Sequence, residues 1–288
     1  MLDVADGRKV TPSSRYMGFM MDDNNKPEEM DQATGTESLP PPTLVEKASE
    51  GLDDLIRTFF IAALIALAVR AVAFEPFNIP SSSMVPNLLI GDYLFVSKYS
   101  YGYSSLSTLY GLVPFKGRLF GQEPQRGDVA VFKLPRDNST DYIKRIVGLP
   151  GDKIQVRDGL LYVNGVAVSR KKLDEQVAAD YVTPDLDSSD YIETFPDGHD
   201  HVIREEGDEM PLDNTPVFEV PPRHYFAMGD NRDNSQDSRT PLVAFIPEDN
   251  LVGRAEVLFF SLEEGTYFWQ IWKWPTSIRW SRLFMKIK

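Results

Sequence analysis

Three consecutive serines, Ser81, Ser82 and Ser83, are residues whose type suggests covalent chemistry. They lie in the stretch PFNIPSSSMVPNLLIG (residues 76–91), with one proline just before them and another shortly after. Proline fixes its own φ and pushes the preceding residue toward extended geometry, so we expect extended backbone here. Because alternate side chains of extended backbone share a face, Ser81 and Ser83 are predicted to point one way and Ser82 the other.

A serine nucleophile needs a base, which is most often a histidine held by a carboxylate. The chain has three histidines. His199 and His201 form an HxH pair in DGHDH, within an acidic, loop-like region, where a metal site would need further ligands that the sequence does not identify. His224 opens a predicted strand and could act as a base, although an ordinary surface or core histidine is the simpler interpretation.

A lysine also activates a serine if burial in an apolar pocket lowers its pKa enough to make it neutral near neutral pH. Lys144 fits this requirement, because it lies in the otherwise apolar, strand-like run YIKRIV (residues 142–147), although a lysine in a strand is ordinarily exposed. Strand alternation puts Lys144 and Arg145 on opposite faces, so that one can be buried while the other stays solvated.

A third polar stretch, GDNRDNSQDSR (residues 229–239), is rich in side chains that form turns and ion pairs. An EF-hand calcium loop requires glycine at its sixth position and glutamate at its twelfth, and this stretch has neither in register. We interpret it as a polar network that fixes a catalytic strand.

An apolar segment, residues 59–74, directly precedes the serine stretch and contains one charge, Arg70. A buried core helix is possible, but the segment is apolar all round rather than striped, unlike a surface helix of a soluble domain. Residues 71–73 (AVA) resemble a signal-peptide cleavage site, but the long acidic stretch before the segment argues against a cleaved signal peptide. We favour a membrane anchor over residues 52–75, in which Arg70 reaches toward the far interface.

The orientation of this anchor follows from the lysines and arginines beside it. Lys47 and Arg57 precede the segment, whereas residues 75–94 contain neither residue type. The N-terminal tail is therefore predicted to be cytoplasmic, and the remainder of the chain to lie outside the cytoplasm.

Composition excludes other classes of protein. The 288 residues include 30 basic and 43 acidic ones, and a net charge of −13 leaves no electrostatic footprint for nucleic acid. The absence of cysteine excludes disulfides and thiolate nucleophiles. Residues 1–51 are acidic and polar with little apolar periodicity, and we predict a disordered tail.

Short β-branched or aromatic runs bounded by turn residues predict strands. The dipeptides Asp158-Gly159 and Asn164-Gly165 predict tight turns, so residues 153–168 should form an antiparallel meander. The predicted strands are YLFV, VAVF, YIKRIV and KIQV, followed later by HYFAM and RAEVLFFSL.

Three further segments have distinctive compositions. Residues 99–121 are rich in Gly, Tyr and Ser and are expected to form a mobile hairpin; residues 170–222 are polar, acidic and loop-like. Residues 267–288 contain five basic residues, no acidic one and all four tryptophans (Trp269, Trp272, Trp274 and Trp280). Such a composition suits a second membrane contact, while packing of its aromatics on the domain is the alternative.

Together these stretches resemble the bacterial type I signal peptidases, membrane-anchored serine proteases that remove signal peptides from exported proteins. The resemblance depends on the combination and order of EPFNIPSSSMVPNLLIGDYLFVSK, DYIKRIVGLPGD, MGDNRDNSQDSR and LVGRAEVLFF after an apolar segment. It covers residues 69–156 and 225–261, with a weaker similarity in WPTSIRWSRL near the C-terminus.

The resemblance implies roles for individual residues. Ser83, directly before the methionine, is implied as the nucleophile and Lys144 as the general base. Ser81 is implied as an oxyanion-hole residue, acting with the backbone N–H of Ser83. Family members commonly have glycine where this chain has Ser82, and the alternation argument already turns Ser82 away from the reaction.

Supporting roles follow from the same resemblance. Ser235 matches a serine that orients the lysine, and four residues match a structural ion-pair network: Arg145, Asp230, Asp237 and Arg239. Shallow apolar pockets for small side chains one and three residues before the cut are expected to be lined by Phe77, Ile79, Met84, Val131 and Ile143.

The implied reaction is acyl transfer, in which neutral Lys144 takes the proton of Ser83 and water later hydrolyses the acyl-enzyme. No cofactor or metal is expected. The expected partners are preprotein signal peptides and the lipid bilayer, with the protein acting as a monomer in the bacterial inner membrane. Alternatives are another Ser-Lys processing peptidase of this fold, such as a conjugative-transfer type, and a non-catalytic membrane-anchored β-domain.

The predicted fold is therefore mainly β: an antiparallel catalytic domain with an inserted second β/loop domain, preceded by one transmembrane helix. The predicted parts are a tail (1–51), an anchor (52–75), a catalytic domain (76–152 and 223–262), an inserted domain (153–222) and a membrane-proximal C-terminal segment (263–288).

Overall fold

The computed structural model describes residues 44–108, 115–173, 187 and 189–288, and within this part the side chains from residue 53 onward. The chain divides into two units, Met1–Asp53 and Asp54–Lys288. Nearly all described residues belong to the second unit, which contains every strand described below. The predicted disorder of the N-terminal tail falls largely outside the described residues.

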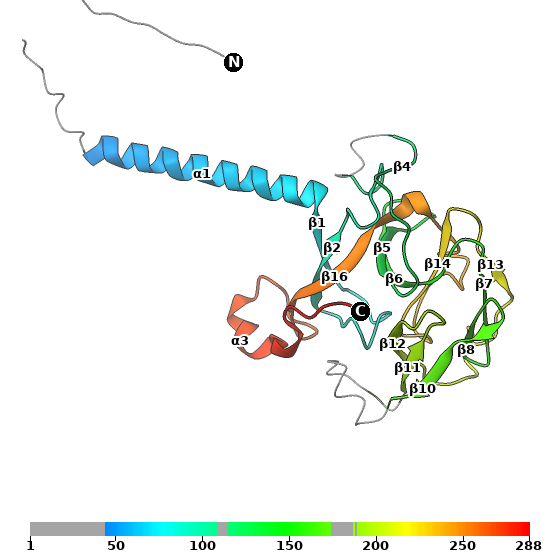
Figure 1. The fold of residues 1–288 in the computed structure, drawn as a ribbon. Coiled ribbons are helices and arrows are strands. Elements are labelled where there is room, and N and C mark those ends of the chain that lie inside the picture. Colours follow the sequence, from blue (N-terminus) through cyan, green and yellow to red (C-terminus); the bar gives the residue numbers. More distant parts are fainter. Residues whose placement is uncertain (1–43, 109–114, 174–186, 188) are drawn as a thin grey trace, which may run out of the picture. The chain divides into compact units, whose positions relative to one another are not determined.

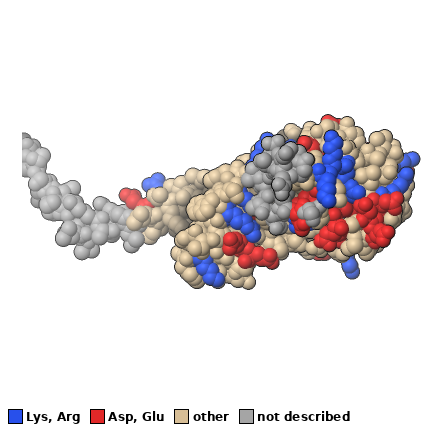
Figure 2. Space-filling view, turned by 90° about the horizontal axis from the view of Figure 1, so that it is seen from below, with Lys and Arg blue, Asp and Glu red and all other residues tan. Residues whose placement is uncertain are grey.

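The first element is helix α1, Leu44–Val72, which begins within the predicted tail rather than at residue 52. Its Asp53–Val72 part is long and apolar enough to cross a membrane, and none of it is buried inside the protein. Figure 2 shows few charged atoms over it apart from those at the end next to the grey residues. The helix ends at Val72 rather than at residue 75, because Phe74 already belongs to a strand.

A seven-stranded sheet forms the main body of the fold (Figure 1). Its strand order is β1-β2-β16-β5-β6-β14-β15, and every neighbouring pair is antiparallel. The strands are β1 (Phe74–Asn78), β2 (Asp92–Ser97), β5 (Val129–Lys133), β6 (Asp141–Gly148), β14 (His224–Met228), β15 (Ile246–Pro247) and β16 (Leu251–Ser261).

Residues between β6 and β14 form two sheets of their own. One has the order β13-β7-β8-β9 and the other β10-β11-β12. Asp158 and Asn164 both have positive φ, followed by glycines with positive φ, so the two predicted turns of the meander are confirmed. The strands are β7 (Lys153–Arg157), β8 (Leu160–Val163), β9 (Val166–Ala167), β10 (Ser169–Lys172), β11 (Asp190–Thr194), β12 (Asp200–Arg204) and β13 (Phe218–Glu219).

The prediction of a mainly antiparallel β fold behind one apolar helix is confirmed. The loop-like interpretation of residues 170–222 is wrong in part, since β10, β11, β12 and β13 lie there. The polar composition of this region did not predict strands, because acidic side chains of β11 are buried in ion pairs. Asp190 is bound by Arg204 and Glu193 by Arg232. The predicted domain boundaries remain a prediction.

The expected hairpin of residues 99–121 has paired ends, β3 (Tyr103–Ser104) and β4 (Arg118–Leu119). Residues 109–114 between them lie outside the described residues, so the predicted mobility of the hairpin stays a prediction.

Both faces of the central sheet are covered by apolar clusters. Val129 and Val131 of β5 belong to one cluster, and their neighbours Ala130 and Phe132 belong to another. Because each face is packed, polar side chains on either face of these strands must find partners inside the protein.

The C-terminal segment packs against the main sheet through polar contacts. It contains η3 (Ile271–Lys273), α3 (Trp274–Ser277) and η4 (Trp280–Arg282). The fully buried Arg282 donates to Asp92 at 2.5 and 3.1 Å, and Lys286 forms a bridge to Val257 of β16. Trp274 packs against Phe260 with ring centroids 4.9 Å apart, whereas three tryptophans are exposed: Trp269, Trp272 and Trp280.

Candidate active site

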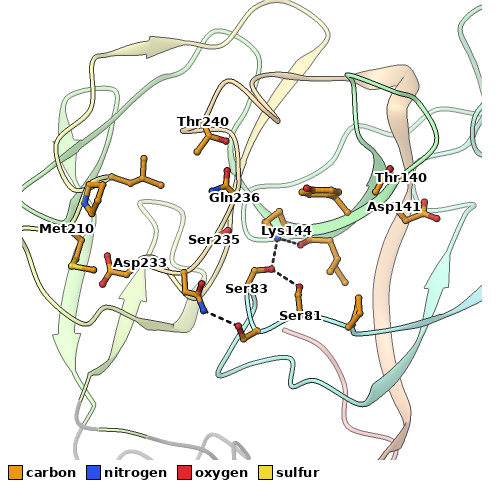
Figure 3. Close-up of a pocket in the computed structure, with 17 residues that line it drawn as sticks. Ser81, Ser83, Thr140, Asp141, Lys144, Met210, Asp233, Ser235, Gln236 and Thr240 are labelled. Atoms are coloured by element: carbon orange, nitrogen blue, oxygen red, sulfur yellow. Dashed lines mark hydrogen bonds between the residues drawn. The ribbon is translucent and has the colours of Figure 1, made fainter. Parts of the chain in front are cut away.

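Ser83 and Lys144 meet at the centre of the candidate site (Figure 3). Ser83 lies in the segment between β1 and β2, and Lys144 lies in the middle of β6. Their side-chain atoms, Ser83 Oγ and Lys144 Nζ, are 2.6 Å apart. The lysine Nζ also donates to the carbonyl of Ile143 at 2.9 Å, which fixes the direction of the amine. This pair has the separation that proton transfer from the hydroxyl to the amine requires.

The serine segment is a series of turns, so the predicted extended backbone is wrong. The amide of Val85 donates to the carbonyl of Ser82, and the amide of Leu88 donates to that of Met84. Met84 and Leu88 are both fully buried in one apolar cluster. Burial of these two side chains, four residues apart, favours a compact turn over the extended geometry that the flanking prolines suggested.

The predicted division of the three hydroxyls nevertheless holds. Ser81 Oγ lies 3.4 Å from Ser83 Oγ, whereas Ser82 Oγ accepts a hydrogen bond from Asn234 at 3.0 Å. Within the described residues, the backbone amide of Ser83 donates to no other group. One hydroxyl and one amide are thus available beside the Ser83 oxygen.

Burial changes the protonation of Lys144. The side chain is only 3% exposed, and this burial lowers the pKa of Lys144 to about 8, while nearby Asp237 and Asp230 act in the opposite direction. Desolvation disfavours the charged ammonium more than the neutral amine. Lys144 is therefore half deprotonated near pH 8, where an ordinary lysine is almost fully charged.

Arg145, which follows Lys144, is also buried, contrary to the expectation that only one of the two would be. It donates to both oxygens of Asp230, at 2.7 and 2.8 Å. Its second terminal nitrogen donates to the carbonyls of Gly127 and Lys288. Burial would raise the pKa of Asp230, but Arg145 more than offsets this and holds it below its usual value.

Asp230 begins a loop that holds the serine segment in place. The next residue, Asn231, donates from its amide to the Ser83 carbonyl and from its side chain to the Ser82 carbonyl, both at 3.2 Å. Asn87 in turn donates to Asp230 at 2.7 Å. Neither asparagine was predicted as a site residue; Asn231 lies within the predicted polar network, but no sequence pattern marks Asn87.

A second ion pair, between Arg239 and Asp237, lies at the C-terminal end of this loop. Arg239 donates to the two oxygens of Asp237, each at 2.9 Å, and the amide of Gly229 donates to Asp237 at 3.0 Å. Gly229 also allows a close approach, because a Cβ there would lie 2.3 Å from Ser235 Oγ and 2.4 Å from the Ser83 carbonyl. The four predicted network residues therefore form two separate pairs, Arg145 with Asp230 and Arg239 with Asp237.

Ser235 lies at the cavity beside Lys144, but its predicted hydrogen bond to the lysine is not present. Its Oγ is buried and has no hydrogen-bond partner within the part of the chain that the structure describes.

An open cavity of about 690 Å³ leads to the pair (Figure 3). Ile143 is one of its lining residues, as predicted. Ile79, Met84 and Val131 instead belong to the apolar cluster on which Phe77 and Ile143 pack, so they form the cavity's support rather than its surface. Other lining residues come from the serine segment, from β6 and from loops around the cavity, and include Ser81, Ser82, Ser83, Tyr142, Lys144, Met210, Leu212, Asp233, Asn234 and Ser235.

The three histidines lie away from this cavity. His201 is buried in β12 rather than in a loop, with its Nε2 3.4 Å from Glu193, and its burial, assisted by Arg145, lowers the pKa of His201. His199 is exposed, and His224 Nδ1 lies 2.9 Å from the Pro222 carbonyl. None of them is placed to act as a base for Ser83.

Replacing Asp230 with alanine is expected to lower the free energy of unfolding by about 3–5 kcal/mol, because it leaves Arg145 charged and buried without its partner. Chemical denaturation followed by tryptophan fluorescence measures this. Arg223→Gln is the matched control, since Arg223 is 64% exposed and its pair with Glu248 should contribute no more than about 1 kcal/mol. Equal losses in the two variants would contradict the structural role of the buried pair.

The chain is similar in sequence to known proteins over most of its length. The family described as "Signal peptidase, peptidase S26" matches residues 52–260. The Signal peptidase I of Rickettsia typhi (strain ATCC VR-144 / Wilmington) is 36% identical over 260 residues, covering 84% of this chain and 96% of the relative. That of Rickettsia conorii (strain ATCC VR-613 / Malish 7) is 38% identical over 240 residues, covering 80% and 85%. A crystal structure of a signal peptidase I from Enterococcus faecalis V583 matches 46% of this chain and 97% of its own with 30% identity and a TM-score of 0.28.

The family match and the relatives indicate a serine peptidase. The chain belongs to the signal peptidase family, peptidase S26. The family and the apolar helix α1 fit a membrane-anchored enzyme.

Proposed function

We propose that this protein is a membrane-bound endopeptidase that cleaves N-terminal signal peptides from exported preproteins after small residues. The observation that carries the proposal is the 2.6 Å separation of Ser83 Oγ and a buried Lys144 Nζ, in a chain of the signal peptidase family. The relatives named above are called Signal peptidase I, which supports the same substrate class for this chain.

The reaction begins when neutral Lys144 accepts the Ser83 proton as Ser83 Oγ attacks the scissile carbonyl. The resulting tetrahedral intermediate collapses to an acyl-enzyme, and the leaving amine takes the proton from Lys144. Lys144 then deprotonates a water molecule that attacks the acyl-enzyme, and it returns this proton to Ser83 Oγ as the acid product leaves, so that Ser83 and neutral Lys144 are both regenerated. The fixed contact of Lys144 with the Ile143 carbonyl keeps the amine directed at the same oxygen through both half-reactions.

The oxyanion of the intermediate needs hydrogen-bond donors. We assign this role to the Ser81 hydroxyl and the Ser83 backbone N–H, since both lie beside Ser83 Oγ and the amide has no other acceptor within the described residues. Ser235 remains a proposed orienting residue: its buried Oγ has no partner there and lines the same cavity as Lys144.

Specificity for small residues is supported by how the cavity is built. Ile143 lines it, and the predicted pocket residues Ile79, Met84 and Val131 belong to the apolar cluster on which Ile143 and Phe77 pack. Close packing resists displacement by a large side chain, so small side chains are favoured one and three residues before the cut.

We place the enzyme as a monomer in the bacterial inner membrane, with α1 as a single span, a cytoplasmic N-terminus and the catalytic part outside the cytoplasm. The lysine and arginine distribution around residues 59–74 supports this orientation. Exposed Trp269, Trp272 and Trp280, together with the basic residues of this segment, suit the headgroup layer. An anchored enzyme and an anchored preprotein share one surface, which raises their effective concentration.

Cleavage of a purified preprotein by the full chain in detergent micelles is expected, with a single cut directly after the small residue that ends the signal peptide. Replacing that residue with a bulky one should reduce kcat/KM by about 100-fold or more, because the extra atoms would have to displace a packed wall. Mass spectrometry of the products locates the cut. If cleavage is indifferent to this replacement, or occurs within the mature protein, the proposed substrate class is wrong.

A further inference from the structure

Three carboxylates lie together beside the cavity: Glu205, Asp213 and Asp233. One oxygen of each lies within 4.8 Å of the corresponding oxygens of the other two. Glu205 directly follows β12, Asp213 lies in the loop that leads to β13, and Asp233 lies in the loop between β14 and β15. Three separate parts of the chain therefore bring their negative charges to one point.

The oxygens of this acidic cluster are incompletely bonded. Asp213 accepts from the amide of Met210 at 2.5 Å, and Asp233 accepts from the amide of Glu206 at 2.6 Å, each through Oδ2. The remaining oxygens, Asp213 Oδ1, Asp233 Oδ1 and Glu205 Oε1, are buried without a hydrogen-bond partner among the residues that the structure describes. Glu205 is 3% and Asp213 1% exposed, so water outside the protein does not compensate them.

The arginines nearest to Glu205 are bound to other carboxylates. Arg170 lies 3.9 Å from Glu205 but donates to Asp208 at 2.9 Å. Arg232 donates to both oxygens of Glu193, at 2.8 and 2.5 Å.

Arg239, the arginine that acts on Asp213, is paired with Asp237. Burial, with Asp233 and Asp213 nearby, raises the pKa of Glu205 to about 8, and burial also raises the pKa of Asp213. The nearby arginines, each bound to another carboxylate, offset the burial of Glu205 only in part. Burying unpaired carboxylates is costly.

We propose that Glu205, Asp213 and Asp233 bind a hard divalent cation, with calcium the best match. Calcium binds six to eight oxygens at 2.3–2.6 Å, so two oxygens on opposite sides of one ion are separated by roughly 4.6–5.2 Å. The oxygens of the cluster lie no more than 4.8 Å apart, so all three can reach one ion at these bond lengths. Magnesium demands near-ideal octahedral geometry at about 2.0–2.1 Å and usually keeps several waters, and the softer transition metals prefer nitrogen or sulfur donors, which the three carboxylates do not provide.

The position of the cluster gives the ion a structural task. Met210, Pro211 and Leu212 line the active-site cavity and directly precede Asp213, and Asp233 and Asn234 line it next to Ser235. Figure 3 shows Met210 and Asp233 together at one side of the cavity, with Ser83 and Lys144 at its centre. An ion shared by Asp213 and Asp233 joins these two loops, and thereby stiffens the wall of the cavity that carries Ser235.

Calcium binding to the full-length protein in detergent micelles tests the proposal. After removal of metals with EDTA and dialysis, equilibrium dialysis with radioactive calcium should find one bound ion per chain that Glu205→Gln and Asp233→Asn each weaken by at least about 10-fold. Calcium at 100 times its dissociation constant should raise the thermal unfolding midpoint by about 5 °C, and the same concentration of magnesium by less.

Glu209→Gln is the matched control, because Glu209 is an exposed acidic residue outside the cluster and its loss should leave calcium binding unchanged. Asp233→Asn guards against misfolding of the Glu205 variant, since Asp233 is only partly buried. If the carboxylates instead share protons, calcium will not stabilise the wild type, and Asp213→Asn will raise the unfolding midpoint at neutral pH without metal. That result, or calcium binding that survives both cluster variants, overturns the proposal.

Discussion

Replacing Ser83 with alanine is expected to lower kcat for preprotein cleavage by about 10⁵-fold or more, the loss typical of removing a nucleophile. The methyl group cannot form the acyl-enzyme, and Lys144 then has no hydroxyl to deprotonate. Ser83 is 9% exposed and its carbonyl is held by the amide of Asn231, so alanine fits the same space and the fold should persist. Single-turnover cleavage of a preprotein measures the loss.

The neighbouring serines are the matched controls. Ser82→Ala should retain activity within a few-fold, because Ser82 Oγ bonds Asn234 and lies outside the reaction. Ser81→Ala should lower kcat by about 100-fold, the usual cost of one oxyanion-hole donor, with little change in KM. Equal activity in the Ser83 and Ser82 variants would remove Ser83 from the mechanism, and a wild-type kcat in the Ser81 variant would remove Ser81 from the oxyanion hole.

Local sequence patterns predicted five of the seven strands of the main sheet, namely β2, β5, β6, β14 and β16, and the meander that follows β6 in the chain. These features depend on residues that are adjacent in the chain. Asp158-Gly159 and Asn164-Gly165 tolerate positive φ and therefore turn the chain whatever surrounds them. In the same way, the β-branched and aromatic residues of β2, β5 and β6 favour strands through their own side chains.

The strands β10, β11 and β12 could not be predicted in this way, because their stability depends on partners elsewhere in the chain. Glu193 of β11 is buried by its ion pair with Arg232, which is 39 residues away. Asp190 at the start of β11 is bound by Arg204 of β12. A polar, acidic composition is typical of a loop until such pairs are known, so the sequence pattern alone favoured the wrong structure.

The candidate site was predictable in its parts but not in its environment. The resemblance identified Ser83 and Lys144 as a pair although 61 residues separate them. Alternation along β6 did not reveal that Arg145 would be buried on the opposite face, because its partner Asp230 comes from a distant loop. The turn conformation of the serine segment likewise depends on the burial of Met84 and Leu88 in a core that no local pattern describes.

The pH dependence of the reaction should follow the protonation of Lys144. Only the neutral amine can accept the Ser83 proton, and burial lowers the pKa of Lys144 to about 8. Below that pH the fraction of neutral lysine falls about tenfold per pH unit, so kcat/KM at pH 6 should be about 50-fold lower than at pH 8. Above pH 9 this dependence should level off. Initial rates of preprotein cleavage from pH 5 to 9.5 measure the profile.

The groups around Lys144 predict how that profile moves. Asp237 raises the pKa of Lys144 and Arg239 lowers it, so Asp237→Asn should shift the rising limb to lower pH. Circular dichroism at each pH separates this shift from unfolding. Asp208→Asn is the control, because it removes an exposed carboxylate away from the cavity, and its pH–rate profile should match that of the wild type. A flat profile from pH 5 to 9 in the wild type would show that the base is not a lysine with a lowered pKa. A limb that moves to higher pH in the Asp237 variant would contradict the electrostatic environment assigned to Lys144, because losing a nearby negative charge can only favour the neutral amine.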